Sequence, residues 1–232
     1  YQMEARGLSL LGQAKAQVPR VVAVSDSLLI MEWIPRGSWT AERMRDLGRQ
    51  LAQVHQFKGK VYGLEEDNFI GILPQSNRPS TDWVSFYLDQ RLGAQFELAL
   101  QRKRIAPTSP RAKGLYRLLE RLERWLPADP PPSLLHGDLW SGNVLPSSGG
   151  GHYLIDPAVY YGHREVDIAF SQYFGGFGEA FYEGYKEAYP LEPDYEERKP
   201  LYQLYYILVH LNLFGEAYGS DVDLILRRYV GK

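Results

Sequence analysis

Apolar positions divide the chain into a short β-containing beginning and a long, mainly helical remainder. Residues 2–16 carry leucine and alanine at helical spacing, which predicts a short helix. Two apolar runs rich in β-branched residues, 20–24 and 28–33, are separated by three polar residues and predict a β-hairpin. A proline and a glycine then interrupt the pattern and predict a linker over residues 35–37.

Helical periodicity dominates the rest of the chain. Thr40 is placed to cap a helix that continues to about His55, because apolar side chains recur on one face of this segment. One stretch, 133–156, breaks the helical pattern and predicts strands joined by loops. The other predicted helices cover residues 82–104, 111–125, 165–173, 179–188, 200–217 and 221–230.

These elements predict an α+β fold in two unequal parts. The helix and hairpin form a small β-containing N-terminal part over residues 1–34. A hinge over 35–37 leads to a large, mainly helical C-terminal part over 38–232.

Composition excludes several classes of protein. The chain has 232 residues, of which 44% are hydrophobic and 23% charged, as in globular domains with a substantial core. A net charge of −2 gives no general attraction to nucleic acid, and the lack of cysteine excludes disulfides and thiolate metal sites. No apolar run reaches the roughly 20 residues that cross a bilayer, and no signal-peptide pattern opens the chain. We therefore expect a cytoplasmic protein that binds neither membrane nor nucleic acid.

The run HGDLWSGNVL, residues 136–145, carries the candidate chemistry. Asp138 and Asn143 lie five positions apart, the offset of the catalytic loop H-R-D-x-x-x-x-N. Asp156 follows after a turn and a strand-like YLI segment. Phosphoryl transfer requires a group that accepts the hydroxyl proton and ligands for magnesium, which prefers oxygen and takes one or two carboxylates. We predict that Asp138 is the catalytic base and that Asn143 and Asp156 bind Mg²⁺.

A purely structural interpretation is the alternative. An isolated Asp-x-x-x-x-Asn occurs often by chance, and His-Gly-Asp is also a good turn between strands. The conjunction favours the chemical interpretation: apolar SLL precedes the loop, VL follows it, and a glycine-rich turn leads to YLID. The sequence therefore indicates a small-molecule kinase that uses ATP and Mg²⁺.

Three neighbours of the motif are candidates for supporting roles. Trp140 is placed either to pack against a sugar ring or to cover the loop itself. We expect His136 to brace the loop by hydrogen bonding, because a carboxylate already supplies the base. Asp167 is expected to accept loop amides beneath the site, and its alternative is an ordinary acidic residue in the first turn of a helix.

The sequence resembles the fructosamine kinase (ketosamine-3-kinase) family, a branch of the aminoglycoside phosphotransferase and choline kinase-like group. HGDLWSGN is shared loosely across that group, whereas IDPAVYYGHREVDIAF, FGGF and DNFIG are more particular to fructosamine kinases. The resemblance runs from about Glu4 to Tyr229. It implies a bilobal protein-kinase-like fold and ATP-dependent phosphorylation of the sugar 3-hydroxyl of ketoamines in deglycation. The acceptor would be a small ketoamine or a glycated lysine, and the oligomeric state stays undetermined.

The resemblance also implies binding residues. Met31 would lie at the back of the nucleotide pocket, and the backbone from there to the hinge would contact adenine, although an ordinary edge strand is the alternative. This nucleotide-binding set is Met31, Glu32, Trp33, Ile34 and the helix glutamate Glu4. Tyr161 and Glu165 would flank the substrate entrance together with Tyr160, His163 and Arg164, although an ordinary surface turn is the alternative.

The beginning of the chain departs from the family pattern. The lysine that should pair with Glu4 would lie upstream, and no glycine-rich phosphate loop precedes it. The first lysine is Lys15, and the chain starts with Tyr1. We expect a fragment with an incomplete N-terminal lobe and little activity; the alternative is a pseudokinase, against which the three motif residues argue.

Two further alternatives concern function. Another small-molecule kinase, acting on an amino alcohol or an aminoglycoside, would need an acidic acceptor cleft that the sequence does not make obvious. The basic residues between 102 and 124 could form an anion-binding face. We expect them instead to lie on a solvated helix neutralised by Glu120 and Glu123, which are interleaved at helical spacing.

Overall fold

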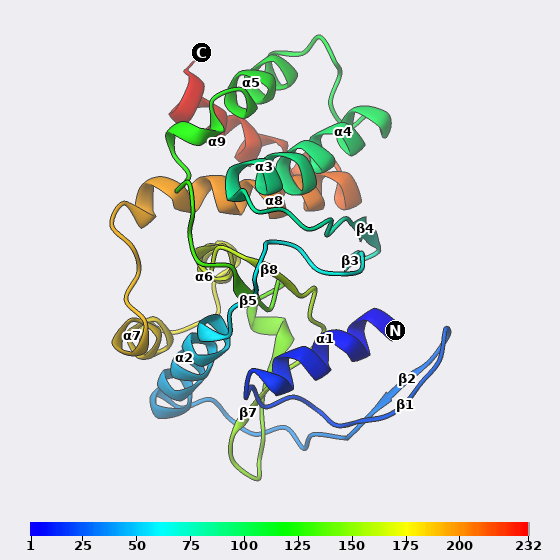
Figure 1. Cartoon of the computed structure of the whole chain (residues 1–232), viewed down its shortest axis with the longest axis vertical. Coiled ribbons are helices and arrows are strands. Elements are labelled where there is room, and N and C mark those ends of the chain that lie inside the picture. The colour runs from blue at the N-terminus through cyan, green and yellow to red at the C-terminus, as the bar shows by residue number, and fades with distance from the viewer. Residues whose placement is uncertain (232) are drawn as a thin grey trace. The chain divides into compact units, whose positions relative to one another are not determined.

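The computed structural model describes residues 1–231 and consists of helices and short antiparallel β-ribbons (Figure 1). The α-helices are α1 (Gln2–Gln13), α2 (Ala41–Gln56), α3 (Trp83–Tyr87), α4 (Gly93–Gln101), α5 (Pro110–Leu119), α6 (Glu165–Tyr173), α7 (Glu179–Ala188), α8 (Tyr195–Phe214) and α9 (Gly219–Val230). The strands are β1 (Val21–Val24), β2 (Leu29–Met31), β3 (Asn68–Ile70), β4 (Leu73–Gln75), β5 (Ser133–Leu135), β6 (Val144–Pro146), β7 (His152–Leu154) and β8 (Tyr160–Gly162). The strands pair as β1–β2, β3–β4, β5–β8 and β6–β7, all antiparallel. This mixture confirms the predicted α+β class.

Contacts within the chain define two compact units. The first unit joins residues 1–60 to residues 131–193, and the second joins 61–130 to 194–232. The first unit contains every residue of the HGDLWSGN motif and all the β-ribbons except β3–β4. These two units are defined by contacts and do not test whether residues 35–37 act as a hinge. The predicted domain boundaries therefore stay a prediction.

Most of the predicted elements are present. The first helix, the hairpin of β1 and β2 and the helix α2 lie where the apolar pattern placed them, and Thr40 Oγ1 accepts a hydrogen bond from Arg43 N at 3.2 Å as the predicted N-cap. The bounds of α6 and α7 coincide with the predicted ranges. The predicted helix 82–104 is α3 and α4 joined by a π-helical turn, Leu88–Leu92.

Two strand elements escaped prediction. The β3–β4 ribbon and β8 lie in segments that were expected to be helix or loop, because each strand has only three residues and too few positions to show a period of two. Buried side chains fix the β3–β4 ribbon instead. Gln75 Nε2 donates to Asn68 Oδ1 at 2.8 Å, and Tyr205 OH donates to Gln75 Oε1 at 2.6 Å. Tertiary hydrogen bonds therefore define this ribbon more than strand propensity does.

Helix α8 begins five residues before the predicted start at Pro200. Proline lacks an N–H, so it leaves the carbonyl four residues earlier, that of Glu196, without its helical donor. Arg228 Nη2 donates to this carbonyl at 3.3 Å from the end of α9. The helix tolerates the proline because a side chain replaces the missing donor. Within residues 1–231, neither α8 nor any other helix is long and apolar enough to span a membrane.

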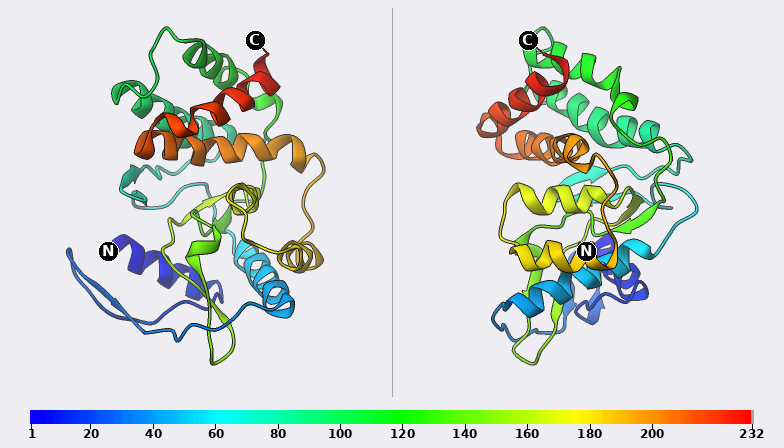
Figure 2. Two further views of the ribbon diagram at one scale, coloured as in Figure 1. Left: turned by 180° about the vertical axis from the view of Figure 1, so that it is seen from behind. Right: turned by 90° about the vertical axis from the view of Figure 1, so that its left-hand side faces the viewer.

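Helices α2 and α7 lie side by side in the first unit (Figures 1 and 2). A Cβ atom at Gly48 of α2 would lie 2.0 Å from the Phe181 carbonyl oxygen, and one at Gly184 of α7 would lie 2.0 Å from the Arg45 carbonyl oxygen. The two backbones therefore touch through glycine. Ion pairs flank the contact, including Arg49 with Glu187 at 2.8 Å.

We predict that Gly48→Ala destabilises the fold by about 2–3 kcal/mol, because an added methyl group must push two backbones apart. Gly12→Ala is the matched control: its Cβ would meet only Val18 Cγ2 at 3.6 Å, so the change should be neutral or stabilise α1 by up to about 1 kcal/mol. Urea unfolding of both variants measures the difference. Equal effects would contradict the close contact of α2 and α7.

Candidate active site

Two short ribbons hold the ends of the predicted catalytic loop. β5 is buried along its whole length and leads into His136. β6 begins at Val144, directly after the loop. Because β5 pairs with β8 and β6 pairs with β7, the loop over residues 136–143 is fixed at both ends.

Asp138 and Asn143 meet across this loop. Asn143 Nδ2 donates to the backbone oxygen of Asp138 at 2.9 Å and to its Oδ2 atom at 3.1 Å. Both side chains are largely buried. The amide nitrogen of Asn143 is thus engaged, and its Oδ1 atom makes no hydrogen bond with any residue from 1 to 231. The five-residue spacing of Asp138 and Asn143 therefore places one carboxylate and one amide oxygen on the same loop.

The turn between His136 and Asp138 requires glycine. Gly137 has φ +81°, and a Cβ atom there would lie 2.0 Å from the Ala158 carbonyl oxygen. Next to this contact, Ala158 N donates a hydrogen bond to His136 O at 2.9 Å. The loop therefore lies directly against the segment that follows Asp156, at a distance only glycine permits.

Backbone bonds tie Asp156 to the catalytic loop. Ile155 N donates to Asn143 O at 3.0 Å, and Asn143 Nδ2 lies 3.4 Å from Asp156 O. Asp156 itself has φ +50°, a left-handed conformation that is costly for a residue with a side chain and that clusters at functional sites. Its carboxylate is exposed and accepts no hydrogen bond within the described part of the chain.

The pKa of Asp138 is displaced strongly upward. Burial raises the pKa to about 7, the charge of Asp156 adds to the rise, and the hydrogen bond from Asn143 opposes it. An unperturbed aspartate has a pKa of about 3.9. A carboxyl group that ionises near neutral pH combines a useful fraction of free base with the strength to accept a proton.

Asp167 anchors the loop from below. Its Oδ2 atom accepts from His136 N at 2.7 Å, and its Oδ1 atom accepts from Gly137 N at 2.9 Å. The carboxylate is completely buried in the first turn of α6. His136 adds a second brace, with Nε2 3.0 Å from Ile155 O. These are the contacts that the sequence analysis expected for His136 and Asp167; their effect on catalysis stays a prediction.

A third partner of Asp167, His55, was not predicted to belong to the site. His55 Nε2 lies 3.1 Å from Asp167 Oδ2, and His55 Nδ1 lies 2.7 Å from Tyr185 OH. Burial lowers the pKa of His55, so the ring is neutral and donates from Nε2 to the carboxylate. One signal was available in the sequence: His55 continues the apolar stripe of Leu47 and Leu51 at helical spacing, where a polar side chain needs a buried partner.

The His-Arg-Glu sequence after β8 is buried and supports the same anchor. Arg164 Nη1 donates to Tyr185 OH at 3.2 Å, and its guanidinium lies 3.8 Å from the Tyr189 ring centroid. Glu165 is fully buried and accepts from Glu192 N at 3.2 Å. The carboxylate of Glu165 therefore faces backbone inside the fold, and its predicted contact with substrate stays a prediction. Tyr161 is half-buried beside Gly59, and its substrate role stays a prediction.

An aromatic pair borders the loop. Trp140 is 40% exposed and Phe174 is 44% exposed, and their rings meet edge to face at 6.4 Å between centroids. The Trp140 ring also covers Gly142, where a Cβ atom would lie 2.3 Å from ring atoms. Both interpretations of Trp140 are thus compatible with its position: it packs on the loop and keeps an open face.

The predicted nucleotide segment offers free backbone groups. Glu32 N donates to Arg20 O at 2.8 Å, whereas Glu32 O and Ile34 N make no hydrogen bond to other residues in the 1–231 range. Met31 is half-buried and Trp33 is 86% exposed. The following residues pair with the end of β6 through Gly37 N and Pro146 O at 2.7 Å, so the hinge segment lies beside the strand that leaves the catalytic loop.

Glu4 of α1 lies near Asp156. Gly7, one turn later in α1, brings the helix close to Pro157, because a Cβ there would lie 3.0 Å from Pro157 Cγ. Burial raises the pKa of Glu4, and the charge of Asp156 raises it further. No lysine or arginine forms an ion pair with Glu4 among residues 1–231. Its role in nucleotide binding stays a prediction.

The donor set suits a hard metal ion such as magnesium. The described residues contain no group of three or more histidine, aspartate or glutamate side chains that could hold a metal alone. The exposed Asp156 carboxylate and the free Oδ1 atom of Asn143 are hard oxygen donors. Magnesium typically takes one or two carboxylates and fills its other positions with phosphate oxygens and water. The two residues therefore fit Mg²⁺ held together with a nucleotide.

We predict opposite effects of two isosteric changes on Asp138. Asp156→Asn should lower the pKa of Asp138 by about 1, because it removes a neighbouring negative charge. Asn143→Leu should raise this pKa, because it removes a hydrogen bond to the ionised form. Carboxyl ¹³C NMR titration of the metal-free protein measures both, with Asp138→Asn identifying the signal. Shifts of the same sign in both variants would contradict the proposed electrostatics.

Comparison with known proteins agrees with this geometry. The fructosamine kinase family model matches residues 1–232. A Lactiplantibacillus plantarum protein named Probable ketoamine kinase is 43% identical over 99% of this chain and 81% of its own length. The chloroplastic protein-ribulosamine 3-kinase of Arabidopsis thaliana is 37% identical over 99% of this chain and 72% of its own length.

Solved structures show the same fold. A candidate fructosamine-3-kinase from Thermobifida fusca superposes with a TM-score of 0.91 at 36% identity, over 97% of this chain and 78% of that one. A choline/ethanolamine kinase family protein from Mesorhizobium loti has a TM-score of 0.59 at 15% identity, over 97% and 77% of the two chains, and shares the fold alone. The fold, the loop geometry and the match along the whole chain lead to one conclusion: the chain belongs to the fructosamine kinase family of ATP-dependent phosphotransferases.

Proposed function

We propose that this protein transfers the γ-phosphoryl group of ATP to the sugar 3-hydroxyl of a ketoamine, with Asp138 as the base. The observation that carries this proposal is the Asp138 carboxyl group, whose pKa lies at about 7 and which shares its loop with Asn143. Asp156 lies beside them with a carboxylate that has no other partner in the described chain. A carboxylate base and a metal-binding pair are the protein groups that phosphoryl transfer requires.

The proton has a defined destination in this mechanism. As the hydroxyl oxygen of the acceptor forms its bond to phosphorus, its proton moves to a carboxylate oxygen of Asp138. Asn143 holds that carboxylate through Oδ2 at 3.1 Å and so fixes the direction of the free oxygen. Asp167 holds the backbone of the same loop, which keeps Asp138 from rotating away during transfer.

Magnesium would be held by Asn143 Oδ1 and the Asp156 carboxylate. When bound, it neutralises charge on the transferred phosphoryl group and the nucleotide phosphates. Such a cation would also compensate the repulsion between Asp138 and Asp156 that raises the pKa of Asp138. The free backbone groups at Glu32 and Ile34 are suited to the adenine edge, with Met31 behind it and Trp33 at the solvent side.

The acceptor class follows from the names of the relatives and from the aromatic pair. The bacterial relative is named a ketoamine kinase and the plant relative a protein-ribulosamine 3-kinase. Trp140 and Phe174 present exposed ring surface beside the catalytic loop, which suits the apolar face of a sugar or the stem of a lysine. Glycated lysine, free or in a protein, is therefore the acceptor that we infer.

We predict that this protein phosphorylates ribulose-lysine or fructose-lysine with ATP and Mg²⁺, and that it acts far less on choline and aminoglycosides. Asp138→Asn should lower turnover by at least about 10³-fold and leave ATP binding intact, because only the base is lost. ADP release, with ³¹P NMR of the product, measures turnover and the site of phosphorylation. Turnover of choline or an aminoglycoside without turnover of either ketoamine would overturn the acceptor assignment.

A further inference from the structure

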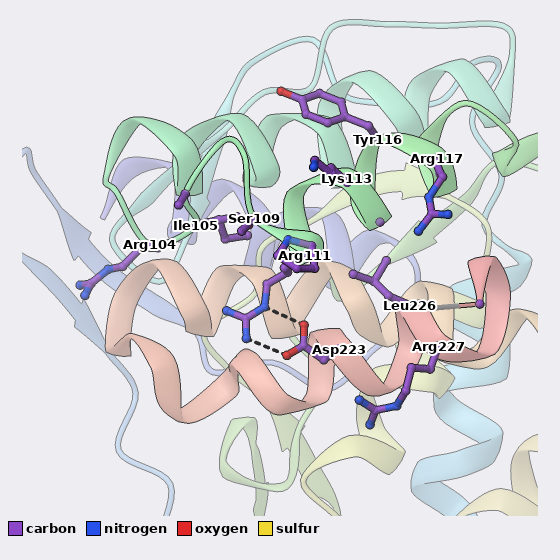
Figure 3. A pocket seen from close by; sticks show the side chains of 14 residues that line it. Arg104, Ile105, Ser109, Arg111, Lys113, Tyr116, Arg117, Asp223, Leu226 and Arg227 are labelled. Atoms are coloured by element: carbon purple, nitrogen blue, oxygen red, sulfur yellow. Dashed lines mark hydrogen bonds and ion pairs between the residues drawn. The ribbon is translucent and has the colours of Figure 1, made fainter.

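The second unit carries an open groove that the kinase mechanism does not use. It lies between α5 and α9, extends to the loop after α4, and has a volume of about 1070 Å³ (Figure 3). Its floor is largely apolar and includes the buried side chains of Ile105 and Leu226. All residues that line it belong to the second unit.

Cationic side chains dominate the rim of this groove. Five of the lining residues are basic and one, Asp223, is acidic; the basic residues are Arg104, Arg111, Lys113, Arg117 and Arg227. Figure 3 shows Arg117 of α5 and Arg227 of α9 on either side of Leu226, with Arg104 at the opposite end. The positive charge is therefore spread along the groove and not gathered at one point.

Within residues 1–231, one of these five cations is held in ion pairs and the other four are not. Arg111 is paired with both Asp223 at 2.8 Å and Glu216 at 2.8 Å. Arg104, Lys113, Arg117 and Arg227 form no ion pair with any residue between 1 and 231, and all four are exposed. The sequence analysis expected Glu120 and Glu123 to neutralise this region, but within the described chain these two form no ion pair either. The expected ion pairing is therefore corrected, whereas the exposure of these side chains to solvent is as expected.

The spacing of the charges favours an elongated ligand. Of the cations that form no ion pair within residues 1–231, Arg104 lies at one end of the groove and Arg117 and Arg227 lie toward the other (Figure 3). A single phosphate or carboxylate group forms ion pairs only within about 4 Å, so it cannot engage both ends of the groove. A peptide rises about 3.3 Å per residue when extended, so a short acidic segment can place one carboxylate at each cation.

The apolar floor adds a second requirement. Ile105, Ala106 and Leu226 offer carbon surface between the charges, which favours apolar side chains interspersed with the acidic ones. Nucleic acid would also present phosphates along its length, but its bases stack best on aromatic side chains, and Tyr116 is the one aromatic residue among the described residues that line the groove.

We propose that the groove between α5 and α9 is a docking surface for an acidic protein segment that also carries apolar anchors. Its cations contact the carboxylates, and the floor around Leu226 receives the apolar side chains. This surface is independent of the phosphoryl-transfer chemistry, so the proposal holds or fails without reference to the acceptor assignment.

An array of short synthetic peptides tests the proposal, with fluorescence anisotropy of the best binders. Three matched classes are compared: acidic with leucine or phenylalanine, acidic with serine in place of those anchors, and neutral with glutamine in place of the acids. We expect the first class to bind at least about tenfold more tightly than each of the others, about 1.4 kcal/mol in binding free energy. Equal binding of all three classes would overturn the proposal.

Charge reversal locates the binding site. Arg117→Glu with Arg227→Glu should weaken binding of the acidic, apolar class at least about tenfold (about 1.4 kcal/mol), and Arg117→Gln with Arg227→Gln gives a milder version if the reversal unfolds the protein. The control is Arg121→Glu with Arg124→Glu, which changes the same net charge outside the groove. Equal losses in both pairs, or single-stranded RNA that binds more tightly than every peptide and depends on Arg117 and Arg227, would contradict a protein-docking groove.

Discussion

The geometry of the active site depends on one buried carboxylate. Asp167 accepts the amides of His136 and Gly137 and the Nε2 proton of His55, at 2.7, 2.9 and 3.1 Å. A buried carboxylate without partners would be very costly, whereas three donors, one of them a neutral imidazole ring, stabilise it in place. Two of these donors are backbone amides of the catalytic loop. Their hydrogen bonds to Asp167 therefore fix the position of Asp138, the next residue in the loop.

Further hydrogen bonds support Asp167 through His55. Arg164 donates to Tyr185 OH, and Tyr185 OH bonds to His55 Nδ1, so a continuous series of hydrogen bonds runs from the end of β8 to the loop. The contact of α2 with α7 brings His55 and Tyr185 together. Packing of two helices through glycine is in this way linked to the orientation of a catalytic side chain.

Three carboxyl groups of the active site, those of Asp138, Asp156 and Glu4, lie close enough to influence one another. The pKa values of Asp138 and Glu4 are both raised by burial and by Asp156. A carboxyl group whose pKa is raised on folding lowers the stability of the fold as pH increases through the range between its unfolded and folded values. The raised pKa values therefore lower the stability of the metal-free protein. They also make Asp138 a base that works near neutral pH, and the carboxyl groups that cause them favour a bound cation.

Local sequence patterns were sufficient for most of the helices, for the first hairpin and for the catalytic loop. The spacing of Asp138 and Asn143, the cap at Thr40 and the apolar stripe of α2 are short-range features, and the structure contains each of them. The partners of His55 and the burial of Glu165 depend on residues more than twenty positions away, which no local pattern encodes.

The same limit applied to two elements of the fold. The β3–β4 ribbon is held by side chains distant in sequence, and α8 accommodates Pro200 because a residue of α9 supplies the missing donor. In each case a tertiary contact overrides the local preference, which is where prediction from sequence ends.

The most direct test of this account is amide hydrogen exchange in Asp167→Asn, a change that keeps the shape but turns one acceptor into a donor. We expect exchange at His136 and Gly137 to accelerate by about 30- to 100-fold, equivalent to about 2–3 kcal/mol, while amides in α9 keep their protection. Phosphoryl transfer should fall in parallel. Unchanged protection at both loop amides, or full activity despite lost protection, would contradict the claim that Asp167 sets the geometry of the catalytic loop.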